Sequence, residues 1–234
     1  MKKFILIICI ACLGGILFRC LFNDSGTFIR TVNNTSILAE NVPFTLKKGD
    51  ILVRPNWGIL PGSCTVEHGR RSGHVAVVVG EATGKSIQEA LEKATVVEAL
   101  FYDQGTHKFQ FSKRDQIREG KAIVSFGNRF KGMRYRLRLS ITDSQADILM
   151  QFLRNQLDGG YNIFSLKRYF SSDPEKEQAL SQMKAANWNC ATLTWEAFYL
   201  VTGVDIDANQ GLLIYPNDII ACRCFDLPEG RILF

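Results

Sequence analysis

The stretch HVAVVVG, residues 74–80, carries the strongest secondary-structure signal in the chain. An unbroken apolar run of this length, rich in β-branched valine, is typical of a buried β-strand. Upstream, KKGD at residues 47–50 predicts a turn that leads into a further strand, ILVR at residues 51–54. The glycines and prolines of residues 55–73 predict a loop between the two strands.

Working outward, the pattern places strands first and helices second. Further strands are expected at residues 95–101, 108–111 and 121–126, with a short helical insertion at 84–93. Three helices are expected after these strands. The first runs from Thr142 to Gly159-Gly160 and begins with a capping box formed by Thr142 and Gln145, followed by an apolar stripe. The second follows Asp173-Pro174, and the third runs from Asn189-Cys190 to Gly203. This order indicates an α+β fold.

The composition excludes several classes of protein. The chain has 234 residues, 46% hydrophobic and 22% charged, which excludes wholesale disorder, a collagen-like repeat and a multi-span membrane protein. The net charge is +5, but Lys2, Lys3 and Arg19 lie in the first twenty residues, which contain no acid. The remainder holds 25 basic and 23 acidic residues, or +2, and this weak bias argues against a nucleic-acid partner.

The N-terminal segment is expected to direct export or to anchor the chain. An apolar run from Phe4 to Phe18 follows two lysines, has the length of a signal-peptide core, and is shorter than the roughly 20 residues of a membrane span. We expect residues 1–20 to be a signal peptide or membrane anchor, 21–46 a tether, and 47–234 one folded domain. This organisation predicts a bacterial cell-envelope protein, exported or membrane-anchored, and leaves cleavage of the leader open.

Four cysteines lie outside the leader, which is too few for a disulfide scaffold: Cys64, Cys190, Cys222 and Cys224. Cys222 and Cys224 are separated by one residue, which is not the two-residue spacing of a redox or zinc motif. A bridge between Cys64 and either member of that pair stays open. No metal or organic cofactor is implied by any spacing in the chain.

Cys190 has surroundings that favour chemistry. If Asn189 caps the helix, Cys190 lies in the first turn, where the helix dipole favours a thiolate. A thiolate is a nucleophile, and the backbone N–H groups beside it can hold an oxyanion. Because a free cysteine is more often a small core residue, partners are needed to support this interpretation.

Two candidate partners interrupt apolar strands. His74 opens its strand, where a side chain can point into a cleft, although a structural histidine is the alternative. Glu98 interrupts an apolar run, and burying a carboxylate is costly unless it is paired. Pairing with an imidazole would orient the ring, whereas the alternative is an exposed position on an edge strand. His68 and His107 are weaker candidates, because they lie in a Gly-rich loop and a polar turn.

The ordered set of motifs resembles a known family. The motifs are GDILVR at 49–54, GHVAVVVG at 73–80, VVEAL at 96–100, GGYN at 159–162 and the Cys-headed helix. Together they resemble the circularly permuted NlpC-type, papain-like hydrolases, specifically the YiiX-like amidase family. Residue by residue, the resemblance assigns Cys190 as nucleophile, His74 as general base and Glu98 as the group that orients His74. Papain has the reverse order, with its cysteine before its histidine.

The resemblance covers about residues 47–205 and departs from the family pattern in two places. Asn162 stands where the family often has Asp, and Asn-Cys-Ala-Thr-Leu at 189–193 replaces the commoner Tyr-Cys-Ser-Glu-Leu. It implies a permuted papain-like fold, in which an antiparallel sheet or barrel packs against a helical part that carries the nucleophile. The implied activity is cleavage of an amide or ester, with a peptidoglycan fragment or an acyl lipid as possible substrate. An acyltransferase of the lecithin retinol acyltransferase type and a non-catalytic envelope binding module remain alternatives.

Five basic residues crowd into residues 129–138: Arg129, Lys131, Arg134, Arg136 and Arg138. One interpretation is attraction to anionic lipid or cell-wall material near a membrane anchor. The other is a solvated strand face whose charges pair with acids such as Glu119.

Overall fold

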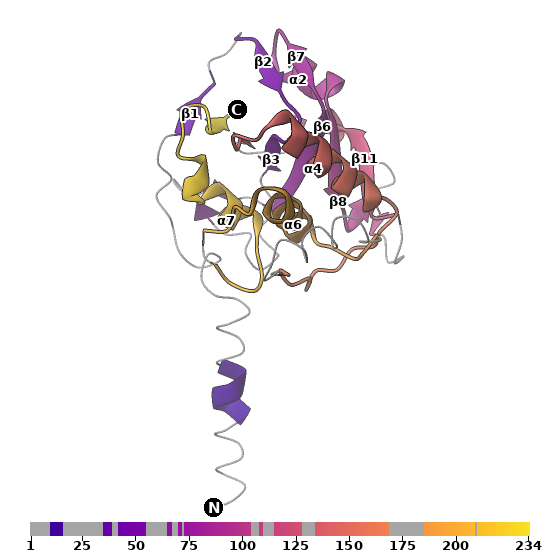
Figure 1. Ribbon diagram of the computed structural model, residues 1–234, viewed down its shortest axis with the longest axis vertical. Coiled ribbons are helices and arrows are strands. Elements are labelled where there is room, and N and C mark those ends of the chain that lie inside the picture. Colours follow the sequence, from indigo (N-terminus) through magenta and orange to yellow (C-terminus); the bar gives the residue numbers. More distant parts are fainter. Residues whose placement is uncertain are drawn as a thin grey trace, which may run out of the picture.

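A seven-stranded sheet forms the centre of the fold (Figure 1). The computed structural model describes residues 10–15, 35–38, 42–54, 65–66, 70–71, 73–103, 108–109, 115–127, 134–168, 185–208 and 210–234. The strands of this sheet, in spatial order, are β1 (Thr35–Ile37), β13 (Arg231–Leu233), β12 (Tyr135–Leu137), β3 (Ile51–Arg54), β6 (His74–Gly80), β8 (Thr95–Ala99) and β11 (Ile117–Lys121). Only the pair of β1 and β13 is parallel among these described strands, and the other neighbours are antiparallel.

Smaller elements surround this sheet. Three two-stranded ladders join β2 (Phe44–Leu46) to β7 (Ala82–Gly84), β4 (Thr65–Val66) to β5 (Arg70–Arg71), and β9 (Tyr102–Asp103) to β10 (Lys108–Phe109). The described helices are α2 (Ile87–Lys93), α3 (Ala122–Phe126), α4 (Asp143–Asn155), α6 (Cys190–Thr202), α7 (Pro216–Ile220) and the 3₁₀ turn η1 (Arg223–Phe225). The molecule is therefore a mixed α+β fold with a mostly antiparallel sheet.

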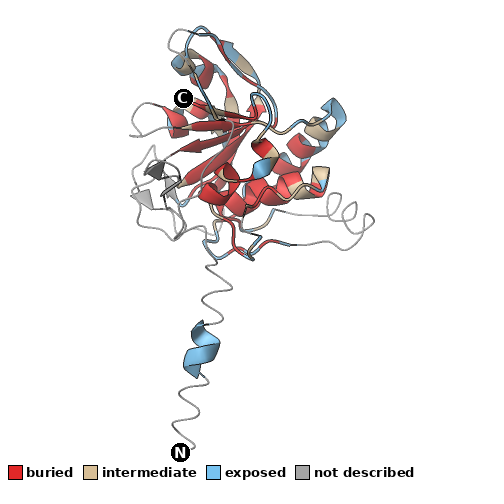
Figure 2. Cartoon of the chain, turned by 90° about the vertical axis from the view of Figure 1, so that its left-hand side faces the viewer, coloured by how far each residue is buried: buried red, intermediate tan, exposed pale blue. Residues whose placement is uncertain are grey.

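Both faces of the sheet are covered, because the strand side chains alternate between two cores. Val75, Val77 and Val97 belong to the larger core, which α4, α6 and α7 complete. Ala76 and Val78 belong to the smaller core with β2, α2 and α3. The central strands are accordingly coloured as buried in Figure 2. This two-sided burial explains why β6 is apolar without interruption.

Helix α4 begins at the expected place and shows the expected cap. The hydroxyl of Thr142 accepts a hydrogen bond from the backbone of Gln145, whose side chain accepts one from the backbone of Thr142. This capping box satisfies N–H groups that a helix leaves without partners at its start. Helix α6 also has its expected limits, from the Asn189 cap to Gly203. The helix expected after Asp173-Pro174 lies outside the described residues.

The prediction of a strand at residues 121–126 is wrong. The strand is β11, which ends at Lys121, and the apolar residues after it form helix α3. The backbone N–H of Ala122 donates to the carbonyl of Ala94 at 3.0 Å, where the ladder with β8 ends. The chain then turns, and the apolar side chains of α3 pack into the smaller core rather than extending the sheet.

The N-terminal expectations are only partly covered by the structure. Residues 10–15 are helical and exposed, and the rest of the expected leader lies outside the described residues. Within the described part of the chain, no helix has the length and apolar character needed to cross a membrane. Strands β1 and β2 lie within the stretch expected to be a tether, so the folded domain takes in residues before 47. Phe44 and Leu46 are buried in the smaller core, which explains why this segment is ordered against the domain.

Candidate active site

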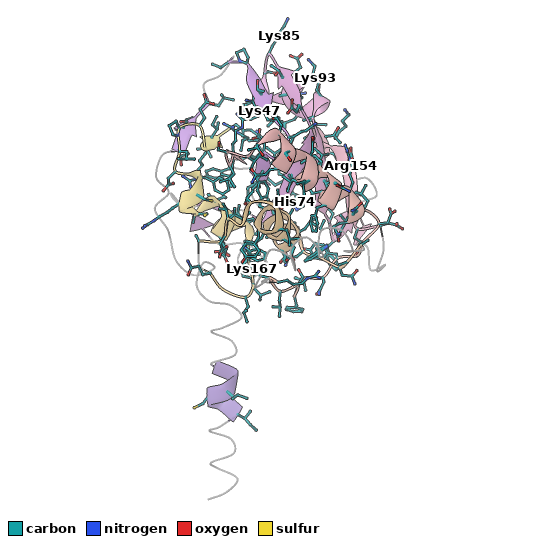
Figure 3. The ribbon with its side chains drawn as sticks, in the orientation of Figure 1. Lys47, His74, Lys85, Lys93, Arg154 and Lys167 are labelled. Carbon is teal, nitrogen blue, oxygen red and sulfur yellow. The ribbon has the colours of Figure 1, made fainter. Side chains whose placement is uncertain are left out.

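His74 and Glu98 meet on one face of neighbouring strands. Val78 of β6 pairs with Val96 of β8, so even-numbered side chains of both strands point to the same side of the sheet. His74 and Glu98 share that side, and the imidazole Nε2 lies 2.8 Å from Glu98 Oε2. Both side chains are buried. Figure 3 labels His74 in the middle of the molecule, where β6 contacts α6.

The second oxygen of Glu98 is also held. The Ser125 hydroxyl of α3 donates to Glu98 Oε1 at 2.7 Å, and Arg118 Nε lies 3.9 Å from the same oxygen. Phe126 of α3 stacks on the His74 ring, with 5.8 Å between the ring centroids. Helix α3 therefore contacts both members of the His–Glu pair.

Cys190 is held at the N-terminus of α6 by its own cap. Asn189 Oδ1 accepts from the Thr192 backbone N–H at 2.8 Å, which fixes the first turn. The Asn189 backbone N–H donates to the Ser165 hydroxyl at 2.9 Å, and the Thr192 hydroxyl donates to the Ser165 carbonyl at 3.1 Å. Cys190 is therefore placed at the positive end of the helix dipole by contacts from two segments.

The thiol of Cys190 meets the side chain of His74. The two side chains lie close enough for each to shift the pKa of the other, and the Val75 backbone also acts on the Cys190 thiol. Since His74 Nε2 faces Glu98, Nδ1 is the ring nitrogen that faces Cys190. The structure thus brings together the three residues that the sequence predicts as a site, in the order Cys190, His74, Glu98.

These contacts oppose the effect of burial on ionisation. Burial raises the pKa of Cys190, but the His74 hydrogen bond and charge, the Val75 N–H and Arg54 together lower it below its usual value. Burial and Arg54 lower the pKa of His74, whereas hydrogen bonds with Cys190 and Glu98 raise it, and the net shift is upward. Burial raises the pKa of Glu98, but His74, Ser125 and Arg118 give a net shift downward. All three shifts favour a thiolate beside an imidazolium and a carboxylate.

Tyr161 is a site residue that the sequence did not indicate as functional. Burial, and after it the neighbouring Cys190, raise the pKa of Tyr161 well above its usual value. The Tyr161 backbone N–H donates to Gln116 Oε1 at 2.6 Å, and Tyr161 forms a parallel bridge with Trp188. The phenol therefore remains neutral and can donate a hydrogen bond beside the sulfur. The tyrosine of the GGYN motif was the available signal.

The other sequence candidates do not join this site in the described residues. Cys64, His68 and His107 lie outside the described part of the chain. Cys222 and Cys224 are free thiols near the C-terminus of the chain.

Arg136 and Arg138 pair with an acid, as the second interpretation of the basic cluster expects, but largely inside the protein rather than on a solvated face. Arg136 is buried, donates to the Glu229 carbonyl at 2.9 Å and lies 3.9 Å from Asp50, and burial lowers the pKa of Arg136 to about 10. Arg138 donates twice to the buried carboxylate of Asp50, at 2.6 Å each. The alternating arginines therefore form an internal ion-pair network. Arg129 and Lys131 lie outside the described residues.

The comparisons with known proteins give little further support. No family model matches the chain. A stretch of 31 residues is 58% identical to the uncharacterized protein YycO of Bacillus subtilis (strain 168) and covers 13% of this chain and 13% of that protein. No solved structure matches.

Proposed function

We propose that this protein is a cysteine hydrolase with a permuted papain-like fold, which cleaves an amide or ester through Cys190, His74 and Glu98. The observation that carries the proposal is the position of the buried His74 imidazole, whose Nε2 lies 2.8 Å from Glu98 Oε2 and which lies beside Cys190 at the start of α6. Nucleophile, base and orienting group in this order form the arrangement of triad catalysis. The resemblance of the ordered motifs to YiiX-like amidases supports the same conclusion.

The first half-reaction forms an acyl-enzyme. His74 Nδ1 takes the proton of Cys190, and the thiolate attacks the carbonyl carbon of the substrate while the carbonyl π electrons move to oxygen. When the intermediate collapses, the C–N or C–O bond breaks and His74 gives its proton to the leaving amine or alcohol. Water then attacks the thioester, His74 accepts its proton, and the carboxylic acid product leaves as the thiolate returns.

The oxyanion is expected to be held from two directions. Cys190 lies in the first turn of α6, whose backbone N–H groups lack partners within the helix. The neutral Tyr161 phenol lies against the sulfur and can supply a second donor. A Tyr161→Phe variant is accordingly expected to lower the rate of acyl transfer to Cys190 while keeping the Cys190–His74 pair.

Apolar side chains beside the site favour a substrate with an apolar group. Phe101 is 38% exposed and contacts the Tyr161 ring, with 5.6 Å between centroids. Phe164 and Leu166 lie on the loop that follows Tyr161 and are 66% and 45% exposed. The backbone N–H of Lys167 in the same loop donates to the carbonyl of Leu212, whose side chain is also 45% exposed. An acyl chain would suit these side chains, so acyl transfer of the lecithin retinol acyltransferase type is the alternative activity to hydrolysis.

The reactivity of Cys190 tests the nucleophile directly. Purified protein is treated with iodoacetamide across a range of pH, and alkylation at each cysteine is followed by peptide mass spectrometry. Cys190 is expected to react near neutral pH faster than the exposed Cys12 of the same chain, and His74→Ala is expected to remove this advantage. If Cys190 reacts no faster than Cys12 in either protein, the proposal is contradicted.

Product analysis separates the two activities. An aryl ester of a medium-chain fatty acid is supplied with and without an added amine or alcohol acceptor. Hydrolysis predicts free acid in both reactions, whereas a transferase predicts an acylated acceptor as the main product of the second. Cys190→Ser is the control for background hydrolysis in both reactions.

A further inference from the structure

Cys222 and Cys224 lie together at the start of η1, outside the candidate active site. Cys222 caps this 3₁₀ turn, and its sulfur accepts the Cys224 backbone N–H at 3.4 Å. Both cysteines are free thiols, and the Cys222 thiol donates to the Asp205 carbonyl at 3.6 Å. The single intervening residue therefore brings the backbone of Cys224 against the Cys222 sulfur, with both thiols in one short turn.

The turn that presents the two thiols is firmly held. The buried Arg231 donates through Nε to the Ile220 carbonyl at 3.0 Å and through Nη2 to the Cys222 carbonyl at 2.8 Å. Its Nη1 donates to Asp226 Oδ1 at 2.8 Å, just beyond the turn. The placement of both cysteines in one turn is thus built into the C-terminal segment of the fold.

We propose that Cys222 and Cys224 form a redox-active dithiol site, which exchanges with low-molecular-weight disulfides and closes to an intramolecular disulfide. Cys222 is buried at 6% exposure, whereas Cys224 is only partly buried, so Cys224 meets the incoming disulfide first. Cys222 lies behind it as the resolving thiol. The proposal is independent of the hydrolase function.

The exchange balances as two thiolate displacements. The Cys224 thiolate attacks one sulfur of the small disulfide, the S–S bond breaks, and the first small thiolate leaves and takes up the proton that Cys224 lost. Cys222 then attacks the Cys224 sulfur, the second small thiol leaves with the proton of Cys222, and the protein disulfide forms. The protein loses two electrons and two protons, and the small disulfide is reduced to two thiols.

The electrostatics of the pair support this chemistry. The hydrogen bond from Cys224 is the main cause that lowers the pKa of Cys222, and the bond with Cys222 raises the pKa of Cys224. The thiolate of the pair is therefore favoured at Cys222, which can take the proton of Cys224 as the Cys224 sulfur attacks. Among the residues that the structure describes, no group of three metal-ligating side chains includes this pair, so the donor set suits exchange better than a four-ligand zinc site.

Peptide mapping tests the proposal. The test uses the full chain with Cys190→Ala, so that Cys222 is the only cysteine of the tryptic peptide 185–223. This protein is incubated with excess oxidised glutathione, denatured in N-ethylmaleimide and digested with trypsin. Trypsin cleaves after Arg223, between the two cysteines. We expect the peptides 185–223 and 224–231 to remain joined without reductant and to separate with it. Recovery of both peptides unlinked, at glutathione ratios that oxidise an ordinary dithiol, would overturn the proposal.

Single-cysteine variants test the order of attack. Cys222→Ser is expected to stop at a glutathione adduct on Cys224, released at least about tenfold more slowly than from the protein with both thiols. Cys224→Ser is expected to leave Cys222 unmodified, because that sulfur is buried. Rapid loss of the adduct from Cys222→Ser would show that Cys222 does not resolve it. Circular dichroism of each variant verifies that the fold is retained, and the intact-chain peptide map does not depend on either variant.

Discussion

The imidazole of His74 connects two buried groups that would each be unfavourable alone. Its Nε2 lies 2.8 Å from Glu98, and its other nitrogen faces the Cys190 thiol. A buried carboxylate needs a partner, and a buried thiolate needs a positive charge beside it. Each charge therefore stabilises the charge beside it, and removing the Glu98 carboxylate should change the pKa of His74 and, through it, that of Cys190.

We expect Glu98→Gln to reduce the reactivity of Cys190 through His74, although Glu98 itself bonds to His74 and Ser125. Without the carboxylate, the pKa of His74 falls and the pKa of Cys190 rises, so the pH profile of iodoacetamide alkylation moves to higher pH. The rate near neutral pH is expected to fall at least about tenfold. Glu119→Gln makes the same charge change on a more exposed side chain of β11 that pairs with Arg154, and should leave the profile in place. An unchanged profile in Glu98→Gln would contradict the role assigned to Glu98.

The same carboxylate gives the fold a pH-dependent stability. The pKa of Glu98 is lowered from 4.5 in the folded state, so its contribution is present above pH 4.5 and is lost as pH falls through the folded pKa. The pKa of His74 is raised from 6.5, so its contribution is full below pH 6.5 and is lost as pH rises through the folded pKa. The difference in free energy of unfolding between wild type and Glu98→Gln should therefore be largest between pH 4.5 and 6.5. Urea unfolding at several pH values measures it, and a difference that grows steadily toward alkaline pH would exclude this account.

The predicted site residues share a property that made them visible in the sequence. His74 opens an apolar strand, Glu98 interrupts one, and Cys190 follows a capping asparagine, so each departs from its local pattern. Ser125 gave no such signal, because it lies within an apolar run that fits a strand as well as a helix. Tyr161 lies on irregular backbone, where neither helical nor strand periodicity applies. Site residues such as Ser125 and Tyr161 can therefore be identified only once the fold is known.

Among the elements, α6 carries most of the proposed chemistry, and both of its ends are fixed by local sequence. Asn189 caps the start, and Gly203 ends the helix in the left-handed conformation with φ of 70°. Long elements with caps were predictable for this reason. The three-residue strands β1 and β13 were harder to predict, because so few positions show little periodicity and the pairing of these strands joins distant parts of the chain.

The end of α6 provides an element-scale prediction. Gly203→Ala places a Cβ in the left-handed region and should lower the free energy of unfolding by about 1–2 kcal/mol. Gly120→Ala is the matched control, because a Cβ there meets no atom within 4 Å and the backbone is not left-handed. Thermal or urea unfolding of the two variants measures the difference. Equal stability of both variants would show that the cap of α6 does not depend on glycine.

For the whole molecule, Asp50 joins segments far apart in the chain. It lies at the start of β3, is 1% exposed, and accepts two hydrogen bonds from Arg138, which follows β12. Arg136, also 1% exposed, lies 3.9 Å from the same carboxylate. One acid therefore balances two guanidinium groups beside the centre of the sheet.

Removing that charge should affect the entire fold. Asp50→Asn leaves buried positive charge without compensation and is expected to lower the free energy of unfolding by about 3 kcal/mol. Asp147→Asn, at a side chain that is 77% exposed and 3.9 Å from Lys48, should have little effect. Urea unfolding of the two variants at one pH and salt concentration provides the measurement. A small effect of Asp50→Asn would mean that the arginines are compensated elsewhere.

The parallel pair of β1 and β13 has a mechanical consequence. β1 lies at one edge of the sheet and is joined to the last strand of the chain by three register pairs, whereas β6 and β8 lie at the opposite side of the sheet order. A pull on the chain from the N-terminal side of Thr35 would act along β1 and load those pairs in shear. These three pairs would then break before those of the central strands, and His74 and Glu98 would keep their spacing while β1 separates from β13.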